Sequence, residues 1–220
     1  FSSKDLYNLA AFRVLFAGTL FFLYLSRQKD VELFYSDSGL LPKNLALQIL
    51  PEAFRPQMLF SLWTEQTLTI VHGIFILSLL MICLGLFSRF FSVVAWVLHL
   101  GFLFRNYGVA FGVDQITAIW LFFMMFTNAD AKFSLKSYLF KDKVARDSDL
   151  LTNVFYRFLQ IHLCIIYFYS GVEKFKGQTW WDGTALWSVF ANSQMVIADF
   201  TWTKHFPFLI LAITFGTILF

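Results

Sequence analysis

The sequence predicts an all-α, polytopic integral membrane protein, a helical bundle with about six transmembrane helices. Hydrophobic residues make up 58% of the 220 positions and charged residues 14%, whereas soluble domains contain about 45–50% and about 25%. The 30 phenylalanines and 7 tryptophans exceed what one soluble core buries, so many of them must face lipid. Apolar runs alternate with polar connections. Inside hydrocarbon such runs must be helical, because every backbone polar group needs a partner.

Six apolar runs define the predicted membrane helices, in chain order residues 6–25, 68–87, 90–104, 109–127, 153–172 and 206 to the end. A long polar connection separates the first two runs, and a tryptophan-rich stretch, residues 173–203, follows the fifth. No fixed-spacing repeat and no linker interrupts this pattern, so we expect one transmembrane domain over residues 1–220. The chain begins at Phe1 and stops inside an apolar run, which predicts that sequence is missing at both ends.

Basic residues set the expected orientation of these helices. Residues 128–151 carry five lysines and arginines in 24 positions, and short connections rich in such residues stay in the cytoplasm. The connections at residues 26–66, 105–108 and 173–203 are then expected to face outward.

Composition and spacing also exclude several classes of function. A net charge of +3 without a basic stripe argues against nucleic-acid binding. The four histidines are scattered without paired spacing, so no metal site is predicted. Cys83 and Cys164 lie inside apolar runs, which is typical of small buried thiols.

Arg13 and Asp114 are ionisable residues inside the predicted spans, and each needs an explanation, because such a residue costs about 2.5–3.5 kcal/mol on insertion scales. Arg13 is either a structural cation, paired with a carboxylate or with helix-end carbonyls, or an anchor for an anionic group in an outward cavity. Asp114, beside Gln115, lies near the outer end of the fourth run. It is expected either to form an ion pair with Arg13 or Arg105 or to take a catalytic role.

Residues 34–42 (Phe-Tyr-Ser-Asp-Ser-Gly-Leu-Leu-Pro) predict a tight turn in the first outer connection. We expect Gly39 to supply a positive φ and Asp37 to accept hydrogen bonds from nearby backbone amides.

The densest chemistry lies where the fifth run reaches the outer interface. Tyr167, Ser170 and Lys174 fall at helical spacing and so share one face. Glu173 points about a quarter-turn away from Lys174 and is not its direct helix partner. Lys174 is either a lysine that reaches the head groups beside interfacial tryptophans or an amine in an apolar, tryptophan-covered pocket. In such a pocket desolvation lowers the pKa of the amine and leaves a neutral general base.

These residues carry a resemblance to a known family. Tyr-Phe-Tyr-Ser-Gly-Val-Glu-Lys at 167–174 and Trp-Asp-Gly-Thr-Ala-Leu at 181–186 resemble the signature of the horizontally transferred transmembrane (HTTM) domain. This is the membrane domain of vitamin K-dependent γ-glutamyl carboxylases and of many bacterial proteins. Phe12-Arg13, residues 35–42 and residues 112–115 are similar to further parts of that pattern, and the matches run in the same order along nearly the whole chain.

The resemblance implies a multi-helix bundle whose active site faces the lumen or periplasm, here the outer side of a bacterial inner membrane. In the carboxylases a lysine deprotonates a reduced vitamin K, oxygen addition gives an alkoxide that removes a glutamate γ-proton, and CO2 captures the carbanion, which is lyase-class chemistry. That lysine corresponds to Lys174. The adjacent family lysine is Glu173 here, and the family histidine near residues 105–115 has no counterpart in that stretch.

Three hypotheses follow. In the first, the chain is a quinol-dependent enzyme with Lys174 as its base and a vitamin K- or menaquinol-type reduced quinone as cofactor. In the second, it is a non-catalytic accessory subunit that scaffolds a membrane assembly or matures an exported peptide, held by a structural network of ion pairs. In the third, it carries a lipid or a quinone. The expected partners are membrane lipids, a quinone-like ligand and a protein of a membrane complex, and the expected ligand contacts are Tyr167, Ser170, Trp180, Trp181, Asp182, Arg13 and Asp114.

Overall fold

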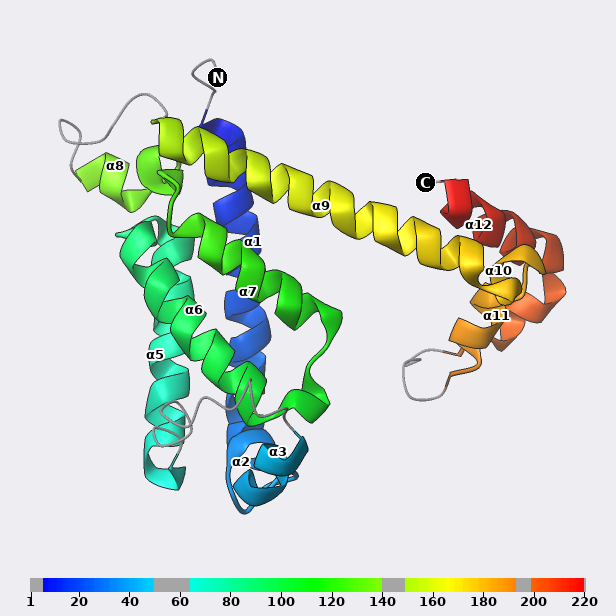
Figure 1. Cartoon of the computed structure of the whole chain (residues 1–220), viewed down its shortest axis with the longest axis horizontal. Helices are drawn as coiled ribbons and strands as arrows, with labels where there is room; N and C mark the ends of the chain where they lie inside the picture. Colours follow the sequence, from blue (N-terminus) through cyan, green and yellow to red (C-terminus); the bar gives the residue numbers. More distant parts are fainter. Residues whose placement is uncertain (1–5, 50–63, 140–148, 193–198, 220) are drawn as a thin grey trace. The chain divides into compact units, whose positions relative to one another are not determined.

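A computed structural model describes residues 6–49, 64–139, 149–192 and 199–219, and these residues form an all-α structure (Figure 1). Its α-helices are α1 (Tyr7–Ser26), α2 (Val31–Tyr35), α3 (Lys43–Ile49), α5 (Glu65–Leu84), α6 (Ser88–Arg105), α7 (Gly112–Met124), α8 (Leu135–Leu139), α9 (Leu150–Lys176), α10 (Gln178–Trp181), α11 (Ala185–Phe190) and α12 (Pro207–Leu219). The 3-10 helices are η1 (Arg27–Asp30), η3 (Tyr107–Val109), η4 (Ala129–Ala131) and η5 (Thr201–His205).

Four helical stretches are long and apolar enough to cross a membrane: Tyr7–Tyr35, Gln66–Leu84, Ser88–Arg105 and Leu150–Lys176. Each of the six predicted apolar runs contains a helix, but α7 and α12 have only 13 residues each. Thirteen residues reach about 20 Å, which is shorter than the hydrocarbon core of about 30 Å. The membrane class is therefore supported by four helices, and the count of six spans stays a prediction.

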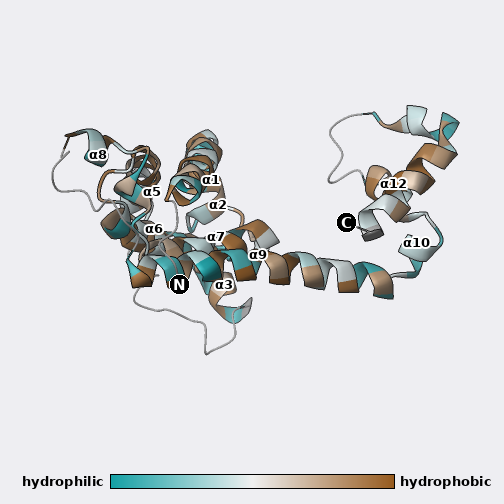
Figure 2. Ribbon diagram, turned by 90° about the horizontal axis from the view of Figure 1, so that it is seen from above, coloured by the Kyte–Doolittle hydropathy of each residue, from teal (hydrophilic) through white to brown (hydrophobic). Residues whose placement is uncertain are grey.

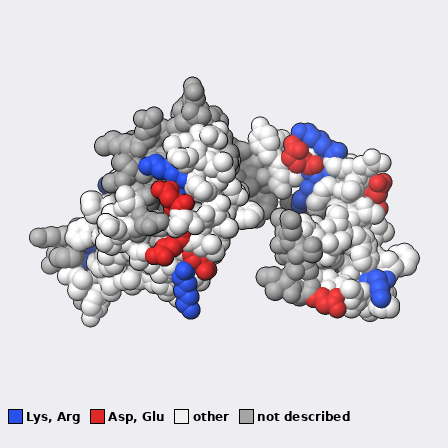
Figure 3. Space-filling view, turned by 90° about the horizontal axis from the view of Figure 1, so that it is seen from below, with Lys and Arg blue, Asp and Glu red and all other residues white. Residues whose placement is uncertain are grey.

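The surface of these helices fits a lipid environment. Brown, for hydrophobic residues, runs along much of the long helices (Figure 2). Charged side chains are few on the face shown in Figure 3, and broad uncharged areas separate them. Many large apolar side chains are exposed, among them Leu15 and Phe22, each at 70%. Exposed apolar surface of this extent is stable in contact with lipid and unfavourable in water.

The chain forms two compact units, residues 1–159 and 160–220, and α9 contributes to both. In the first unit α1 packs on α5, α5 on α6, and α6 on α7. The buried residues of its core come from all of these helices, and its largest fully buried apolar side chains include Phe75, Phe102, Leu79, Leu121 and Met124. This division into two compact units does not test the expectation of one transmembrane domain, which stays a prediction.

Arg13 is fully buried and holds three segments of the first unit together. Its Nη1 donates to the carbonyl oxygens of Ile82 (2.7 Å) and Cys83 (3.0 Å) in the last turn of α5. Its Nη2 donates to the carbonyl oxygens of Phe133 (2.6 Å) and Lys132 (3.4 Å), which precede α8. Carbonyls in the last turn of a helix lack the intrahelical donors of the other turns, so the Arg13 guanidinium supplies N–H donors to the end of α5. Of the expected structural roles, the structure shows the pairing with helix-end carbonyls.

Gly85 makes room for this guanidinium. It ends α5 in the left-handed region, with φ 71°, and its amide donates to the Ile82 carbonyl in a glycine-type helix end. A Cβ at Gly85 would lie 2.9 Å from Arg13 Cζ and would overlap Arg13 Nη1 and Ser134 Cβ. Glycine is therefore required here both for the turn and for the approach of the cation.

The predicted turn forms at residues 36–41, but its backbone conformation differs from the prediction. Gly39 does not adopt a positive φ, so that part of the prediction is wrong. Its amide donates to the Ser36 carbonyl, and a Cβ would lie 2.8 Å from the Glu32 carbonyl oxygen and would overlap that of Leu33. Glycine is needed at this position because two backbone segments approach each other closely.

Arg105, at the end of α6, is also buried and fixes this turn. Its Nη1 donates to the Leu41 carbonyl (2.8 Å), and its Nη2 donates to the Ser36 carbonyl (2.8 Å) and to Asp37 Oδ1 (2.9 Å). Asp37 Oδ1 also accepts a hydrogen bond from the Lys43 amide (3.2 Å), which confirms its predicted role as a backbone acceptor.

The second unit packs α12 against α10 and α11. Thr214 of α12 donates to the Gly183 carbonyl (3.4 Å) in the turn between α10 and α11. Gly183 adopts φ 70°, and a Cβ there would overlap the Leu211 side chain of α12. Phe190 and Phe200 stack with centroids 4.7 Å apart.

Asp149 caps the first turn of α9 and anchors it to the first unit. Its Oδ1 accepts from the Thr152 amide (2.8 Å), and its Oδ2 accepts from Arg89 Nη2 (3.2 Å). Partial desolvation raises the pKa of the Asp149 carboxyl, but the hydrogen bonds from Thr152 and the Arg89 guanidinium outweigh it and hold that pKa below its ordinary value. Ionised Asp149 is therefore the form that stabilises the start of α9.

Replacing Arg13 by methionine should destabilise the first unit strongly. Several buried carbonyls lose their donor, and each unsatisfied buried group costs about 1–3 kcal/mol. We expect a large fall in the melting temperature of the detergent-solubilised protein, measured by thermal shift. Lys29→Met, at an exposed cation, is the control and should leave the melting temperature nearly unchanged. Equal melting temperatures for the two variants would contradict the structural role of Arg13.

The stability that Asp149 contributes should disappear in acid. Its pKa is lower in the folded protein than in the unfolded chain, so the contribution is present above the unfolded pKa and is lost as the pH falls through the folded pKa. Asp149→Asn keeps a capping side chain without the charge. The difference in melting temperature between wild type and this variant should therefore shrink from about pH 6 toward about pH 3. Asp149→Ala, which also removes the cap, should cost about 0.5–2 kcal/mol at neutral pH. A wild-type advantage over Asp149→Asn that grows in acid would refute this account.

Candidate functional site

Lys174 lies near the end of α9, where its amine contacts two uncharged groups of the second unit. Its Nζ donates to the Thr217 carbonyl of α12 (2.8 Å) and lies 5.3 Å from the centre of the Trp180 ring. The side chain is half-buried. Trp180 reaches this position because α9 ends at Lys176 and α10 begins at Gln178, which folds the tryptophan back over the lysine. A cation over an indole face is stabilised electrostatically.

No carboxylate lies within salt-bridge distance of Lys174 in the parts of the chain that the structure describes. The adjacent Glu173 instead pairs with Lys176, at 2.7 Å, and both of these side chains are 65% exposed. Glu173 is therefore not the counterion of Lys174, and this confirms the prediction from helical spacing that the two side chains do not pair. The amine of Lys174 has a carbonyl and an aromatic ring as its neighbours.

The other residues predicted around Lys174 lie on exposed surface. Tyr167 and Ser170 sit on the same unbroken helix, α9, and both are exposed. Trp181 is 55% exposed, with its Nε1 donating to the Phe175 carbonyl (2.7 Å). Asp182 is exposed in the turn after α10. Their ligand-binding roles stay predictions.

Arg13 and Asp114, the two remaining predicted contacts, belong to the first unit. The expected ion pair of Asp114 with Arg13 or Arg105 is wrong, because Arg13 donates to backbone carbonyls and Arg105 pairs with Asp37. The carboxylate of Asp114 instead accepts from a phenol and from a backbone amide. Predicting an ion pair from two charges in apolar runs overlooks that backbone carbonyls compete for the same cation.

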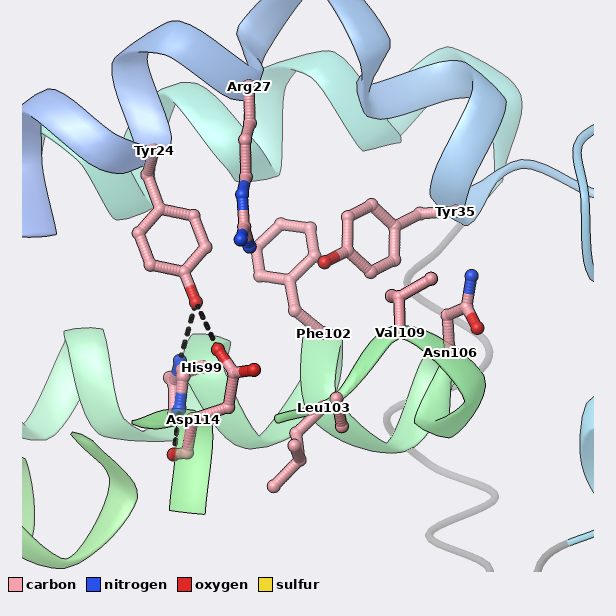
Figure 4. A pocket seen from close by; sticks show the side chains of 10 residues that line it. Tyr24, Arg27, Tyr35, His99, Phe102, Leu103, Asn106, Val109 and Asp114 are labelled. Atoms are coloured by element: carbon pink, nitrogen blue, oxygen red, sulfur yellow. Dashed lines mark hydrogen bonds between the residues drawn. The ribbon is translucent and has the colours of Figure 1, made fainter. Parts of the chain in front are cut away.

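Asp114 is part of a buried polar cluster formed by three helices (Figure 4). The Tyr24 hydroxyl of α1 lies 3.3 Å from Asp114 Oδ1 of α7 and 3.3 Å from His99 Nδ1 of α6. His99 Nε2 lies 2.8 Å from the main-chain oxygen of Asp114. Tyr24 is 3% exposed, His99 1% and Asp114 7%. We call these three residues the polar triad.

The start of α7 fixes the carboxylate of the polar triad. Asp114 is the third residue of α7, and its Oδ2 accepts from the Phe111 amide (2.8 Å), one of the donors left free at a helix N-terminus. The positive end of the helix dipole also favours a negative charge at this place. Asp114 is therefore held in one orientation, with Oδ1 turned toward Tyr24.

A small cavity borders the polar triad. Its walls include Arg27, Tyr35 and Asn106, and its volume of about 10 Å³ is roughly that of one water molecule (Figure 4). Arg27 is half-buried and its guanidinium lies 5.5 Å from the Tyr24 ring centre. A water held among such polar groups can connect the polar triad to its surroundings.

An apolar groove of about 350 Å³ runs between α1 and α7, and its lining residues are Phe12, Leu15, Phe16, Thr19, Leu20, Val113, Ile116, Thr117 and Trp120. The Trp120 ring meets Phe12 and Phe16 edge-on, with centroids 5.1 Å and 5.3 Å apart. The groove has the volume of a small ligand site, and its chemistry suits a hydrocarbon chain.

Sequence reasoning missed Tyr24 and His99. One signal for His99 was present. Spacings of three or four residues, typical of one helix face, separate the buried residues Ser88, Ser92, Ala95, His99 and Phe102 of α6. No comparable signal marked Tyr24. Of the two cysteines, Cys83 is half-buried, whereas Cys164 is exposed on α9, so burial was predicted wrongly there; both are free. Among the described residues no group of histidine, cysteine and acidic side chains could hold a metal.

Comparison with protein-family models, with curated proteins and with solved structures found no match. The functional argument therefore rests on the residues and their geometry.

Proposed function

We propose that this chain is a membrane-embedded enzyme domain similar to the membrane domains of vitamin K-dependent carboxylases, and that Lys174 is its general base. The residues at 167–174 and 181–186 carry the resemblance. The observation that supports a catalytic amine is that Lys174 Nζ donates to the Thr217 carbonyl and lies over the Trp180 ring, and that no carboxylate of the described residues lies within salt-bridge distance of it.

The proposed substrate is a reduced quinone of the vitamin K or menaquinol type, bound from the bilayer. Lys174 Nζ takes the proton of one quinol hydroxyl, so that the O–H bond breaks and an N–H bond forms. The resulting quinol anion reacts with molecular oxygen. The Trp180 ring covers the amine on one side, and Ser170 and Tyr167 lie one and two turns earlier on α9, where they border the approach to it.

A second candidate is a non-catalytic membrane subunit. The observation that favours it is the same 2.8 Å hydrogen bond from Lys174 to the Thr217 carbonyl, because it joins α9 to α12. In this role Lys174 stabilises the second unit, and the chain presents its helices to a protein partner. The two candidates differ in whether the amine must be able to lose its proton.

Substitutions at Lys174 separate these candidates. If Lys174 is a base, Lys174→Ala and Lys174→Arg should both reduce oxygen-dependent quinol consumption by about 10²-fold or more. Arginine cannot replace the base because it stays protonated. The melting temperature of both variants should change little. If Lys174 is structural, Lys174→Ala should lower the melting temperature and Lys174→Arg should restore it. Both quantities are measured on protein reconstituted in vesicles with a menaquinol analogue.

Lys176→Ala is the matched control, two residues away on the same helix and exposed. It should keep wild-type turnover and stability. Undiminished turnover in Lys174→Ala would refute the catalytic role, and an unchanged melting temperature in that variant would refute the structural one.

We also propose six membrane spans, with the Lys174 end outside the inner membrane and residues 128–151 inside. In a variant without Cys83 and Cys164, a cysteine placed at Lys176 should react with a membrane-impermeant maleimide on intact bacterial cells. A cysteine placed at Lys136 should react only after the cells are opened. The reverse pattern would invert the topology, and labelling of both positions on intact cells would refute the six-span arrangement.

A further inference from the structure

The hydrogen bonds of the polar triad fix the tautomer of His99. A main-chain carbonyl oxygen only accepts, so the 2.8 Å contact with the Asp114 carbonyl requires a proton on His99 Nε2. In a neutral imidazole Nδ1 is then an acceptor. The Tyr24 hydroxyl lies 3.3 Å from this nitrogen and 3.3 Å from Asp114 Oδ1, which is also an acceptor when the carboxyl is ionised.

The polar triad is therefore one proton short. The Tyr24 hydroxyl has a single hydrogen, so it can serve His99 Nδ1 or Asp114 Oδ1 but not both in full. An acceptor left without a donor in an apolar interior costs about 1–3 kcal/mol, and more when it is charged. One added proton would give both acceptors, His99 Nδ1 and Asp114 Oδ1, a hydrogen bond.

We propose that Tyr24, His99 and Asp114 form a buried proton-binding site, which takes up one proton on the Asp114 carboxyl. The added proton lies on Oδ1 and is donated to the Tyr24 oxygen. The Tyr24 hydrogen is then donated to His99 Nδ1, and the His99 Nε2 hydrogen stays on the Asp114 main-chain oxygen. The chain of hydrogen bonds starts and ends at the same residue, and every donor and acceptor in it has a partner.

The proton comes from water through the small cavity beside Arg27. Tyr35 and Asn106 also line this cavity, which has space for about one water molecule. Tyr24, His99 and Asp114 themselves line this cavity, so a water molecule in it reaches the polar triad without movement of the helices.

Two groups besides the other members of the polar triad lie close to the Asp114 side chain. Arg27 lines the same cavity, and the Phe111 amide at the start of α7 donates to Asp114 Oδ2. Tyr35 and His72 are further titratable groups near Tyr24. The His72 ring centre, on α5, lies 6.2 Å from that of Tyr24, and its Nδ1 is 2.6 Å from Gln28 Oε1. This site lies in the first unit and does not depend on the role of Lys174.

Infrared difference spectroscopy of the reconstituted protein tests the proposal. Acidification from about pH 8 to about pH 4 should produce the carbonyl band of a protonated, hydrogen-bonded carboxylic acid in addition to the signals of surface carboxyls. Asp114→Asn should remove this band. Tyr24→Phe keeps the ring and its packing but removes the hydroxyl that accepts the hydrogen bond of the protonated carboxyl, so it should shift the frequency of the band. This variant supplies a second readout if Asp114→Asn does not fold.

Asp199→Asn is the control, at an exposed carboxyl outside the membrane-spanning segments, and should leave the assigned band in place. The proposal is overturned if no band depends on Asp114, or if Tyr24→Phe and His99→Gln both leave its frequency unchanged.

Discussion

The first unit depends on how buried cations are satisfied where little water reaches them. Among the described residues Arg13 has no carboxylate within salt-bridge distance and uses backbone carbonyls instead, two at the end of α5 and two before α8. A guanidinium can do this because its planar fork presents several donors at once. Arg105 repeats the arrangement at the end of α6, with two carbonyls and one carboxylate. Each arginine thus joins a helix end to a connection distant in sequence, and Gly85 and Gly39 leave the backbone room to approach.

The predictable part of the fold is the part that depends on local sequence. Apolar runs bounded by polar residues predicted where helices form, because a helix satisfies its own backbone wherever the run is long enough. The pairing of Arg13 with helix-end carbonyls could be named as an alternative but not selected, since the choice depends on contacts 69 to 120 residues away. The conformation of Gly39 was predicted wrongly for a more local reason: glycine is needed there because the Glu32 and Leu33 carbonyls approach it closely, and not because the turn has a positive φ.

The two candidate sites differ in how visible they were in the sequence. Tyr167, Ser170 and Lys174 share a helix, so a spacing of three or four residues was enough to put them on one face. The polar triad combines α1, α6 and α7, and its Tyr24 contacts are separated by 75 and 90 residues. A single chain offers no periodic signal for such a contact. The sequence did show an acidic residue in an apolar run. Burying such a residue is energetically unfavourable, which predicts that other residues hydrogen-bond to it.

The chemistry of the two sites also differs in what each requires of the membrane. The proposed base, Lys174, is half-buried at the end of α9, so solvent can reach it directly beside the Trp180 ring that covers it on one side. Asp114 lies in the interior, and any proton it gains must cross a cavity of water size. A tyrosine between the carboxyl and an imidazole suits that position, because a phenol accepts and donates at one oxygen and so passes on a hydrogen bond without adding a charge to an apolar surrounding. Uncharged relays of this kind are the arrangement that a bilayer interior tolerates at least cost.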